Sequence, residues 1–163
     1  MSKKKCIVIF IIAILLVTIL FFVIYNLSKS NKLSKRISSY YNNLQQDMFE
    51  MNINDFVDFE WDYMIIYKNP TSASDIKEIA GIIYEKELDL ESGMIFVKDN
   101  KIIYEETFKT DFETPYQFII YPYQDVNSKL NVNKIEKEKA MFSGKKIKYN
   151  NENRYTFYPL FEN

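Results

Sequence analysis

The feature that most restricts the fold of this chain is an unbroken apolar run near its N-terminus. The run extends from Ile7 to Tyr25, and its only polar interruption is Thr18. Because an α-helix rises about 1.5 Å per residue, the run is about 28 Å long, close to the thickness of a bilayer's hydrocarbon core. A charge at its centre would cost at least about 2.5 kcal/mol, and none is present. We expect residues 7–27 to be a transmembrane anchor in the lipid bilayer, preceded by a cytoplasmic head at residues 1–6.

A cleaved export signal is the alternative to a retained anchor. Such a signal usually has an apolar region of about 7 to 15 residues, followed by a small-x-small cleavage site. The run in this chain is longer, and the nearest small pair, Ser28 and Ser30, is a poor cleavage site. The sequence therefore favours an uncleaved anchor.

The charges on either side of the run give opposing indications about orientation. Lys3, Lys4 and Lys5 lie against its start, together with the terminal amine, and favour a cytoplasmic N-terminus. The residues that favour the reverse follow the run in a more dispersed group: Lys29, Lys32, Lys35 and Arg36. We expect a single-pass protein of the cell membrane with its N-terminus in the cytoplasm and its C-terminal domain outside.

The absence of two residue types excludes much of enzyme chemistry. Histidine is absent, and the only cysteine, Cys6, precedes the apolar run. The commonest general base, the commonest zinc ligand and a thiol nucleophile are therefore missing from residues 28–163, which we call the tail. Because the tail is also weakly acidic, it lacks the basic stripe that nucleic acid requires. We expect a protein that is not an enzyme, has no cofactor and does not bind nucleic acid.

Helical periodicity follows the apolar run. Apolar residues recur every three or four positions, which is the spacing of one helix face: Leu33, Ile37, Tyr40, Leu44, Met48 and Met51. The pattern predicts an amphipathic juxtamembrane helix over residues 28–53, packed on a sheet. A short self-association seam is the alternative.

The remainder, residues 54–163, shows strand and turn signals. Alternation predicts a strand with one apolar face at Phe59, Trp61, Tyr63, Ile65 and Tyr67. Ser72 and Asp75 form a capping-box pattern before a helix at residues 73–80 that ends at Gly81.

Further turn signals complete the expected fold. A hairpin is predicted around Asp99 and Asn100, a buried strand at "YQFIIY", and a second hairpin between "KKIKY" and "RYTFYPLF". Asn133 and Glu136 suggest a helical turn. Together these elements predict an α+β domain with a mostly antiparallel sheet and two or three helices.

Two groups of side chains are candidate binding sites. Aromatic residues in excess of what a core needs would form an interaction surface, and the candidates are Trp61, Tyr63, Tyr67, Tyr121 and Tyr123. The alternative is that they are core residues. An acidic cluster could supply oxygen ligands to Ca²⁺, although a solvated strand face is the alternative; it comprises Asp55, Asp58, Glu60 and Asp62.

A basic stretch near the C-terminus is a further candidate. Two acidic residues, Glu136 and Glu138, lower its net charge, and it is either a solvated face or a contact for a membrane or an acidic wall polymer. The stretch comprises Lys134, Lys137, Lys139, Lys145, Lys146 and Lys148.

The order of several segments resembles a group of small exported proteins from low-GC Gram-positive bacteria, which are membrane-anchored or lipid-modified. The resemblance spans Phe56 to Phe161 and is carried by "FEWDYMIIY", "PTSASDIKEIAG", "IFVKDNKIIY", "KEKAMFSG" and a final aromatic strand. Trp61 and Asp62 match the family's aromatic-Trp-Asp strand, whereas the turn at Pro70 lacks the family's tyrosine. The resemblance implies a location in the cell envelope and a fold, and it implies no activity.

These features predict a membrane-anchored extracytoplasmic interaction module that binds an envelope protein or a wall component through a sheet face. Three alternatives remain open. The domain could bind a metal or small ligand through the acidic cluster, hydrolyse a substrate with converging carboxylates, or act as an immunity-type protein that protects its own membrane.

Overall fold

The computed structural model describes residues 14–19, 32–88, 91–109, 118–123, 131–149 and 151–161. Residues 14–19 are helical. The elements that follow are α2 (Leu33–Asn42), β1 (Met48–Asn52), η1 (Ile53–Asp55), β2 (Tyr63–Tyr67), α3 (Ala73–Ala80), β3 (Glu91–Lys98), β4 (Lys101–Lys109), β5 (Phe118–Ile120), β6 (Val132–Glu136), η2 (Lys137–Lys139), β7 (Met141–Tyr149) and β8 (Glu152–Pro159). The expected α+β class is confirmed.

The N-terminal predictions fall mostly outside this description. Residues 1–6, most of 7–27 and residues 28–31 are not among the described residues. Within the described parts of the chain, no helix has both the length and the apolarity needed to cross a bilayer.

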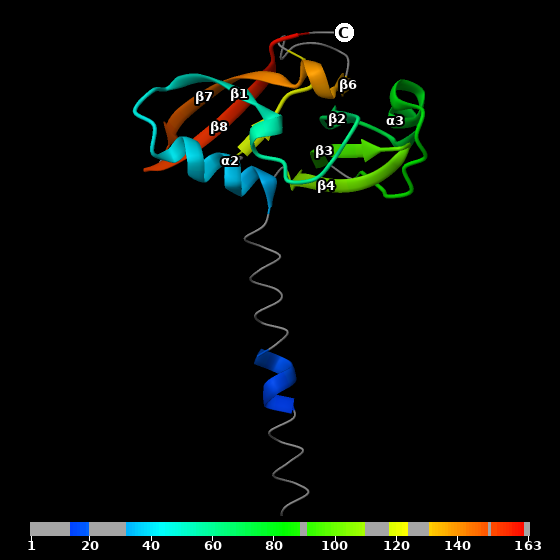
Figure 1. The fold of residues 1–163 in the computed structure, drawn as a ribbon, viewed down its shortest axis with the longest axis horizontal. Coiled ribbons are helices and arrows are strands. Elements are labelled where there is room, and N and C mark those ends of the chain that lie inside the picture. Colours follow the sequence, from blue (N-terminus) through cyan, green and yellow to red (C-terminus); the bar gives the residue numbers. More distant parts are fainter. Residues whose placement is uncertain are drawn as a thin grey trace, which may run out of the picture.

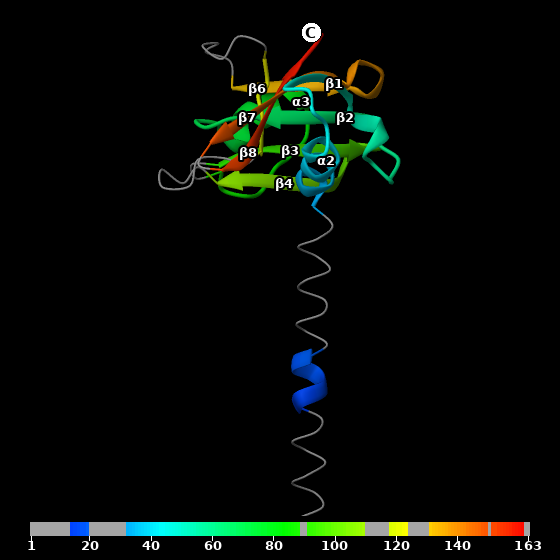
Figure 2. The ribbon, with the colours of Figure 1, turned by 90° about the vertical axis from the view of Figure 1, so that its left-hand side faces the viewer.

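The strands form two sheets, where the sequence indicated one. Sheet A has the order β1-β7-β8-β5, and sheet B has the order β4-β3-β2-β6 (Figure 1). All described pairings are antiparallel except the parallel pair β5 and β8. Figure 2 shows the strands of sheet B one above another with α2 at their side.

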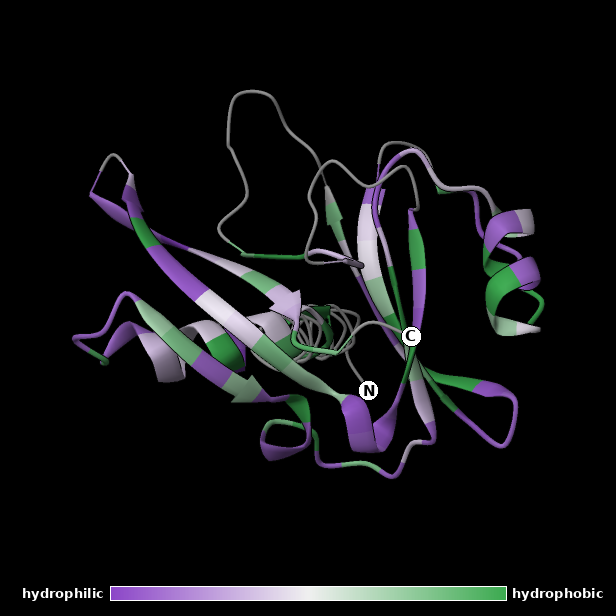
Figure 3. Cartoon of the chain, turned by 90° about the horizontal axis from the view of Figure 1, so that it is seen from above, coloured by the Kyte–Doolittle hydropathy of each residue, from purple (hydrophilic) through white to green (hydrophobic). Residues whose placement is uncertain are grey.

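The main core lies between the two sheets and α2. It contains the side chains of the inner sheet faces and one stripe of α2, among them Ile37, Met51, Trp61, Met64, Phe96, Phe142 and Phe157. A second apolar cluster lies on the other face of sheet B, beneath α3, and includes Tyr63, Ile65, Tyr67, Ile76, Ile95 and Val97. Figure 3 shows α3 on the outer side of sheet B, away from sheet A. Sheet B is therefore covered on both faces.

The double coverage explains why all five residues of β2 are buried. Tyr63, Ile65 and Tyr67 pack towards α3, whereas Met64 and Ile66 pack into the main core. The sequence analysis predicted one apolar face for this strand, and it did not place a helix over that face.

Several local predictions are confirmed. Ser72 and Asp75 form a reciprocal capping box at the start of α3, and Gly81 ends it with a φ of 74°. The β3–β4 turn places Asp99 and Asn100 at φ values of 49° and 58°, a region that asparagine and aspartate tolerate. The hairpins β3–β4 and β7–β8 and the buried strand β5 are present as expected.

The amphipathic helix over residues 28–53 is wrong in its C-terminal part. α2 ends at Asn42, and Met48–Asn52 forms β1, paired with β7. Strand pairing overrides the helical spacing there, since Met51 reaches the core from β1. The stripe of α2 also differs: Tyr41 is buried and Tyr40 is 60% exposed. α2 and β1 therefore belong to the domain, whose start lies before residue 54.

The helical turn suggested by Asn133 and Glu136 is misplaced, because the turn before the second hairpin, η2, begins only after Glu136. These residues lie in β6, which pairs with β2, and Asn133 is buried, donating from its side-chain amide to the Pro122 carbonyl at 2.7 Å. Spacing alone cannot distinguish a capping pattern from two polar residues on a strand.

A pair of glycine substitutions tests this packing. An alanine Cβ at Gly93 would lie 2.6 Å from the Glu106 carbonyl oxygen and 2.6 Å from the Tyr67 hydroxyl, whereas at Gly81 it meets only the strain of a positive φ. We expect Gly93→Ala to lower the free energy of unfolding by about 3 kcal/mol and Gly81→Ala by about 1 kcal/mol. Denaturant unfolding of the full chain in detergent measures both, and the reverse order would contradict this arrangement.

Candidate functional site

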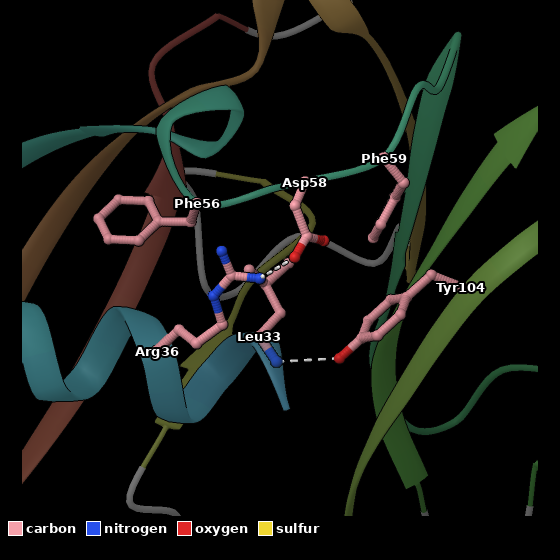
Figure 4. A pocket seen from close by; sticks show the side chains of 6 residues that line it. All are labelled: Leu33, Arg36, Phe56, Asp58, Phe59 and Tyr104. Atoms are coloured by element: carbon pink, nitrogen blue, oxygen red, sulfur yellow. Dashed lines mark hydrogen bonds and ion pairs between the residues drawn. The ribbon is translucent and has the colours of Figure 1, made fainter. Parts of the chain in front are cut away.

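A pocket of about 340 Å³ lies where the start of α2 meets the segment after η1 and the middle of β4 (Figure 4). Its lining side chains come from these three segments and combine aromatic rings with one cation and one anion: Leu33, Arg36, Phe56, Asp58, Phe59 and Tyr104. The pocket therefore borders the point at which the chain enters the domain.

One wall of the pocket is fixed because β4 caps the start of α2. The first backbone N–H groups of a helix have no partner within it, and the N-cap residue Lys32 offers no side-chain cap. The Leu33 N–H donates to the Tyr104 hydroxyl at 2.9 Å, and the Ser34 N–H donates to Glu106 Oε2 at 3.2 Å. The Ser34 hydroxyl also donates to this carboxylate, and the Tyr104 hydroxyl donates to it at 2.8 Å. We call this group, Ser34, Tyr104 and Glu106, the α2 clasp.

The clasp is electrostatically favourable although it buries a charge. Glu106 is only 4% exposed, but its carboxylate accepts three hydrogen bonds and lies at the positive end of a helix dipole. Burial also raises the pKa of the Tyr104 hydroxyl, so the phenol stays protonated and available as a donor.

The opposite end of α2 is fixed to sheet A. The Tyr41 hydroxyl donates to the Glu50 carbonyl of β1 at 3.0 Å, and burial raises its pKa to about 12. The Asn42 side-chain oxygen accepts from Asn153 at 2.5 Å and from the Tyr155 hydroxyl at 3.2 Å, both on β8. α2 therefore connects the two sheets.

The charged pair in the pocket is available for exchange with a ligand. Arg36 and Asp58 are 3.1 Å apart, with side chains 40% and 74% exposed. Exposed pairs of this kind contribute little to stability, so a competing anion could replace the carboxylate. Phe59 and Tyr104 stack at 5.5 Å and form an aromatic wall (Figure 4). The pocket can bind a polar group.

The aromatic interaction surface predicted from the sequence is wrong for three of its five members. Trp61, Tyr63 and Tyr67 are 2%, 6% and 0% exposed. They lie in the two apolar clusters, on either face of sheet B. Tyr121 and Tyr123 are half-buried. The expected surface does not exist as one patch because β2 is covered on both sides.

The acidic cluster is divided among separate cations. Asp58 pairs with Arg36 and Glu60 with Lys137. Asp62 accepts from Lys98 at 2.7 Å and from the Asp99 N–H at 2.8 Å, and these hydrogen bonds lower its pKa. Asp55 lies in η1. In the described part of the chain, no three acidic side chains converge in a way that could hold a metal ion.

The basic stretch is likewise split between elements. Lys134 and Lys137 lie on β6 and η2, where Lys134 Nζ is 4.0 Å from the Tyr63 ring centroid. Lys146 on β7 donates to the Leu44 carbonyl, whereas Lys145 and Lys148 are exposed. The stretch therefore does not form a single continuous patch on one element.

A surface that the sequence analysis missed lies on the outer side of sheet A. Because strand side chains alternate, the neighbours of the buried Phe142, Tyr155 and Phe157 point away from the core. The side chains concerned define what we call the open face of sheet A: Met48, Glu50, Ser143, Lys145, Ile147, Tyr149, Glu152, Arg154, Thr156 and Tyr158, with Tyr121 stacked on Tyr158.

The open face combines apolar, aromatic and cationic groups. Met48, Ile147 and Tyr149 are 67%, 45% and 47% exposed. The Arg154 guanidinium lies 3.6 Å from the Tyr149 ring centroid, and Tyr121 stacks on Tyr158 at 5.1 Å. In residues 32–161 as described, α2 packs into the main core and α3 on sheet B, so neither covers this face. The alternation in "KKIKY" was the signal that could have revealed it.

Comparison with known proteins adds no relative. No family model, no curated protein and no solved structure matches this chain. The resemblance to small exported proteins therefore stays a prediction, and the function must be argued from the geometry described above.

The α2 clasp can be tested by changing one atom of the carboxylate. Glu106→Gln would replace one accepting carboxylate oxygen by an amide NH2 group, which cannot accept from the three donors of Ser34 and Tyr104. We therefore expect the free energy of unfolding to fall by about 2 kcal/mol. Glu105→Gln, which changes the same residue type one position earlier, should cost at most about 0.5 kcal/mol because its pair with Lys86 lies at the surface. Equal losses in the two variants, measured by denaturant unfolding, would contradict the clasp.

Proposed function

We propose that this protein is a single-pass membrane protein without enzymatic activity, whose α+β domain lies outside the cytoplasm and binds another envelope protein. The observation that carries the proposal is the open face of sheet A. Its exposed Met48, Ile147 and Tyr149 lie on a face against which no described helix packs, whereas sheet B has the main core on one face and α3 over β2 and β6 on the other, with Ile102 and Ile103 of β4 37% and 42% exposed. Uncovered apolar groups of this kind, rimmed by charge, are typical of protein-binding surfaces.

The chemistry of the open face favours a protein partner over a wall polymer. Arginine, tyrosine and methionine are enriched at protein interfaces, and Arg154 is already held by its contact with Tyr149. Lys145 adds positive charge to this face, which also carries Glu50 on β1 and Glu152 opposite Tyr149. The partner that this surface fits has an apolar patch with charged groups of both signs at its rim.

The membrane part of the proposal is supported by the sequence. The apolar run from Ile7 to Tyr25 has the length and composition of a bilayer-spanning helix, and Lys3, Lys4 and Lys5 favour the cytoplasmic N-terminus. The resemblance to anchored exported proteins agrees with this orientation. Since α2 is part of the domain, the domain begins only a few residues after the proposed anchor.

Site-specific photo-crosslinking in intact cells tests the proposed surface. A photoreactive residue at Tyr149 should give a discrete adduct, and the same residue at Lys77 on α3 should not. With a photoreactive residue at Lys145, Ile147→Ser should reduce the adduct several-fold, because it removes exposed apolar contact area. The matched change Ile79→Ser, at an isoleucine of α3 with 46% exposure, should leave the adduct unchanged.

Four results would contradict the proposal. Equal adducts from Tyr149 and Lys77 would show that the open face is not selective. An adduct that glycan digestion removes would identify a wall polymer, and an adduct of twice the protein's own mass would identify a second copy. Extraction of the full chain from membranes by alkaline carbonate would contradict the anchor itself.

A further inference from the structure

The first turn of α2 carries three exposed cations, Lys32, Lys35 and Arg36. Lys32 is the residue before the helix, and the other two follow at helical spacing on the same side as Ser39. We call Lys32, Lys35 and Arg36 the basic turn. Its side chains lie outside the apolar stripe of Leu33, Ile37 and Tyr41 and so do not contribute to the main core.

The basic turn is joined to the proposed anchor by a very short segment. Six Cα–Cα steps lead from residue 27 to Leu33. Even a fully extended chain covers at most about 21 Å in six steps. Because the α2 clasp attaches Leu33 and Ser34 to β4, the domain cannot move away from the bilayer by releasing α2. The tether thus keeps the basic turn at a high effective concentration of lipid headgroups.

The acidic groups near the basic turn do not cancel its charge. Glu106 is buried and its oxygens accept hydrogen bonds from the clasp, and together with Asp58 it sets two negative charges against the three cations of the basic turn. Asp58 pairs with Arg36 but is 74% exposed, and a phosphate can replace it at little cost. Guanidinium and ammonium groups both donate to phosphate oxygens.

We propose that the basic turn binds the phosphate headgroups of anionic lipids and thereby sets which side of the domain faces the bilayer. This inference rests on the proposed anchor. The attraction acts within a Debye length, about 8 Å at physiological salt, which the tether allows the turn to reach. With the basic turn directed at the membrane, the open face of sheet A stays in a constant orientation towards its partner.

Fluorescence quenching in reconstituted vesicles tests the proposal with the full chain. Cys6→Ser removes the only native thiol, and Ser39→Cys then places a fluorophore on the exposed side of α2. The vesicles contain phosphatidylcholine alone or with phosphatidylglycerol, together with a headgroup nitroxide lipid as quencher. We expect phosphatidylglycerol to increase quenching at position 39 several-fold, and sodium chloride to reverse the increase by screening.

Matched variants separate lipid binding from a structural role. Changing Lys32, Lys35 and Arg36 together to Gln should abolish the increase. Asp58→Asn breaks the Arg36 ion pair but keeps the cations, so the increase should persist. A label at Glu78→Cys on α3 should report no effect of lipid charge.

The outcomes distinguish this inference from the proposed function. Equal quenching in both lipids, or an increase that survives the triple change, would overturn the inference while leaving the anchor intact. Loss of the increase in Asp58→Asn would assign Arg36 a structural role and would also overturn it. Extraction of the chain from the vesicles by alkaline carbonate would overturn both proposals together.

Discussion

The buried carboxylate of Glu106 is the contact on which the arrangement of this molecule depends. It supplies the cap that the start of α2 lacks, because the local sequence offers only Lys32 at that position. The far end of α2 is held by β1 and β8 through Tyr41 and Asn42. The first turn of α2 is therefore attached to sheet B, and the last turn of α2 is attached to sheet A. A helix of ten residues would be only marginally stable alone, so these tertiary contacts must hold it.

This connection relates the fold to the proposed function. With α3 on sheet B and α2 inside the main core, the outer side of sheet A is the described sheet face that no helix covers (Figure 1). The chain enters the domain at the clasp, so the proposed anchor would be connected through α2 to both sheets. A domain attached by a long linker could turn freely, whereas this geometry lets a membrane protein present one face in a defined direction.

The local features of the fold could be predicted from the sequence, whereas the long-range features could not. The capping box at Ser72, the turn at Asp99 and the strand ended near Pro122 depend on neighbouring residues, and all are as expected. Other features depend on partners far along the chain, which the periodicity of a local segment does not reveal. They are the division into two sheets, the burial of Tyr63 beneath α3 and the strand at Met48–Asn52. The sequence analysis did not predict the α2 clasp for the same reason. Glu106 is an ordinary acidic residue in sequence, and only the approach of β4 to α2 gives it a role.

Hydrogen exchange of the α2 amides tests most directly whether α2 is an integral part of the domain. With the full chain in detergent, we predict that the backbone amides of Arg36–Asn42 exchange as slowly as those of β8. Glu106→Gln should accelerate exchange throughout α2 while the amides of the β2–β6 pair stay protected, because β3 lies between this pair and β4, which carries Glu106. Rapid exchange of α2 in the unmodified protein, or no acceleration in Glu106→Gln, would contradict the account.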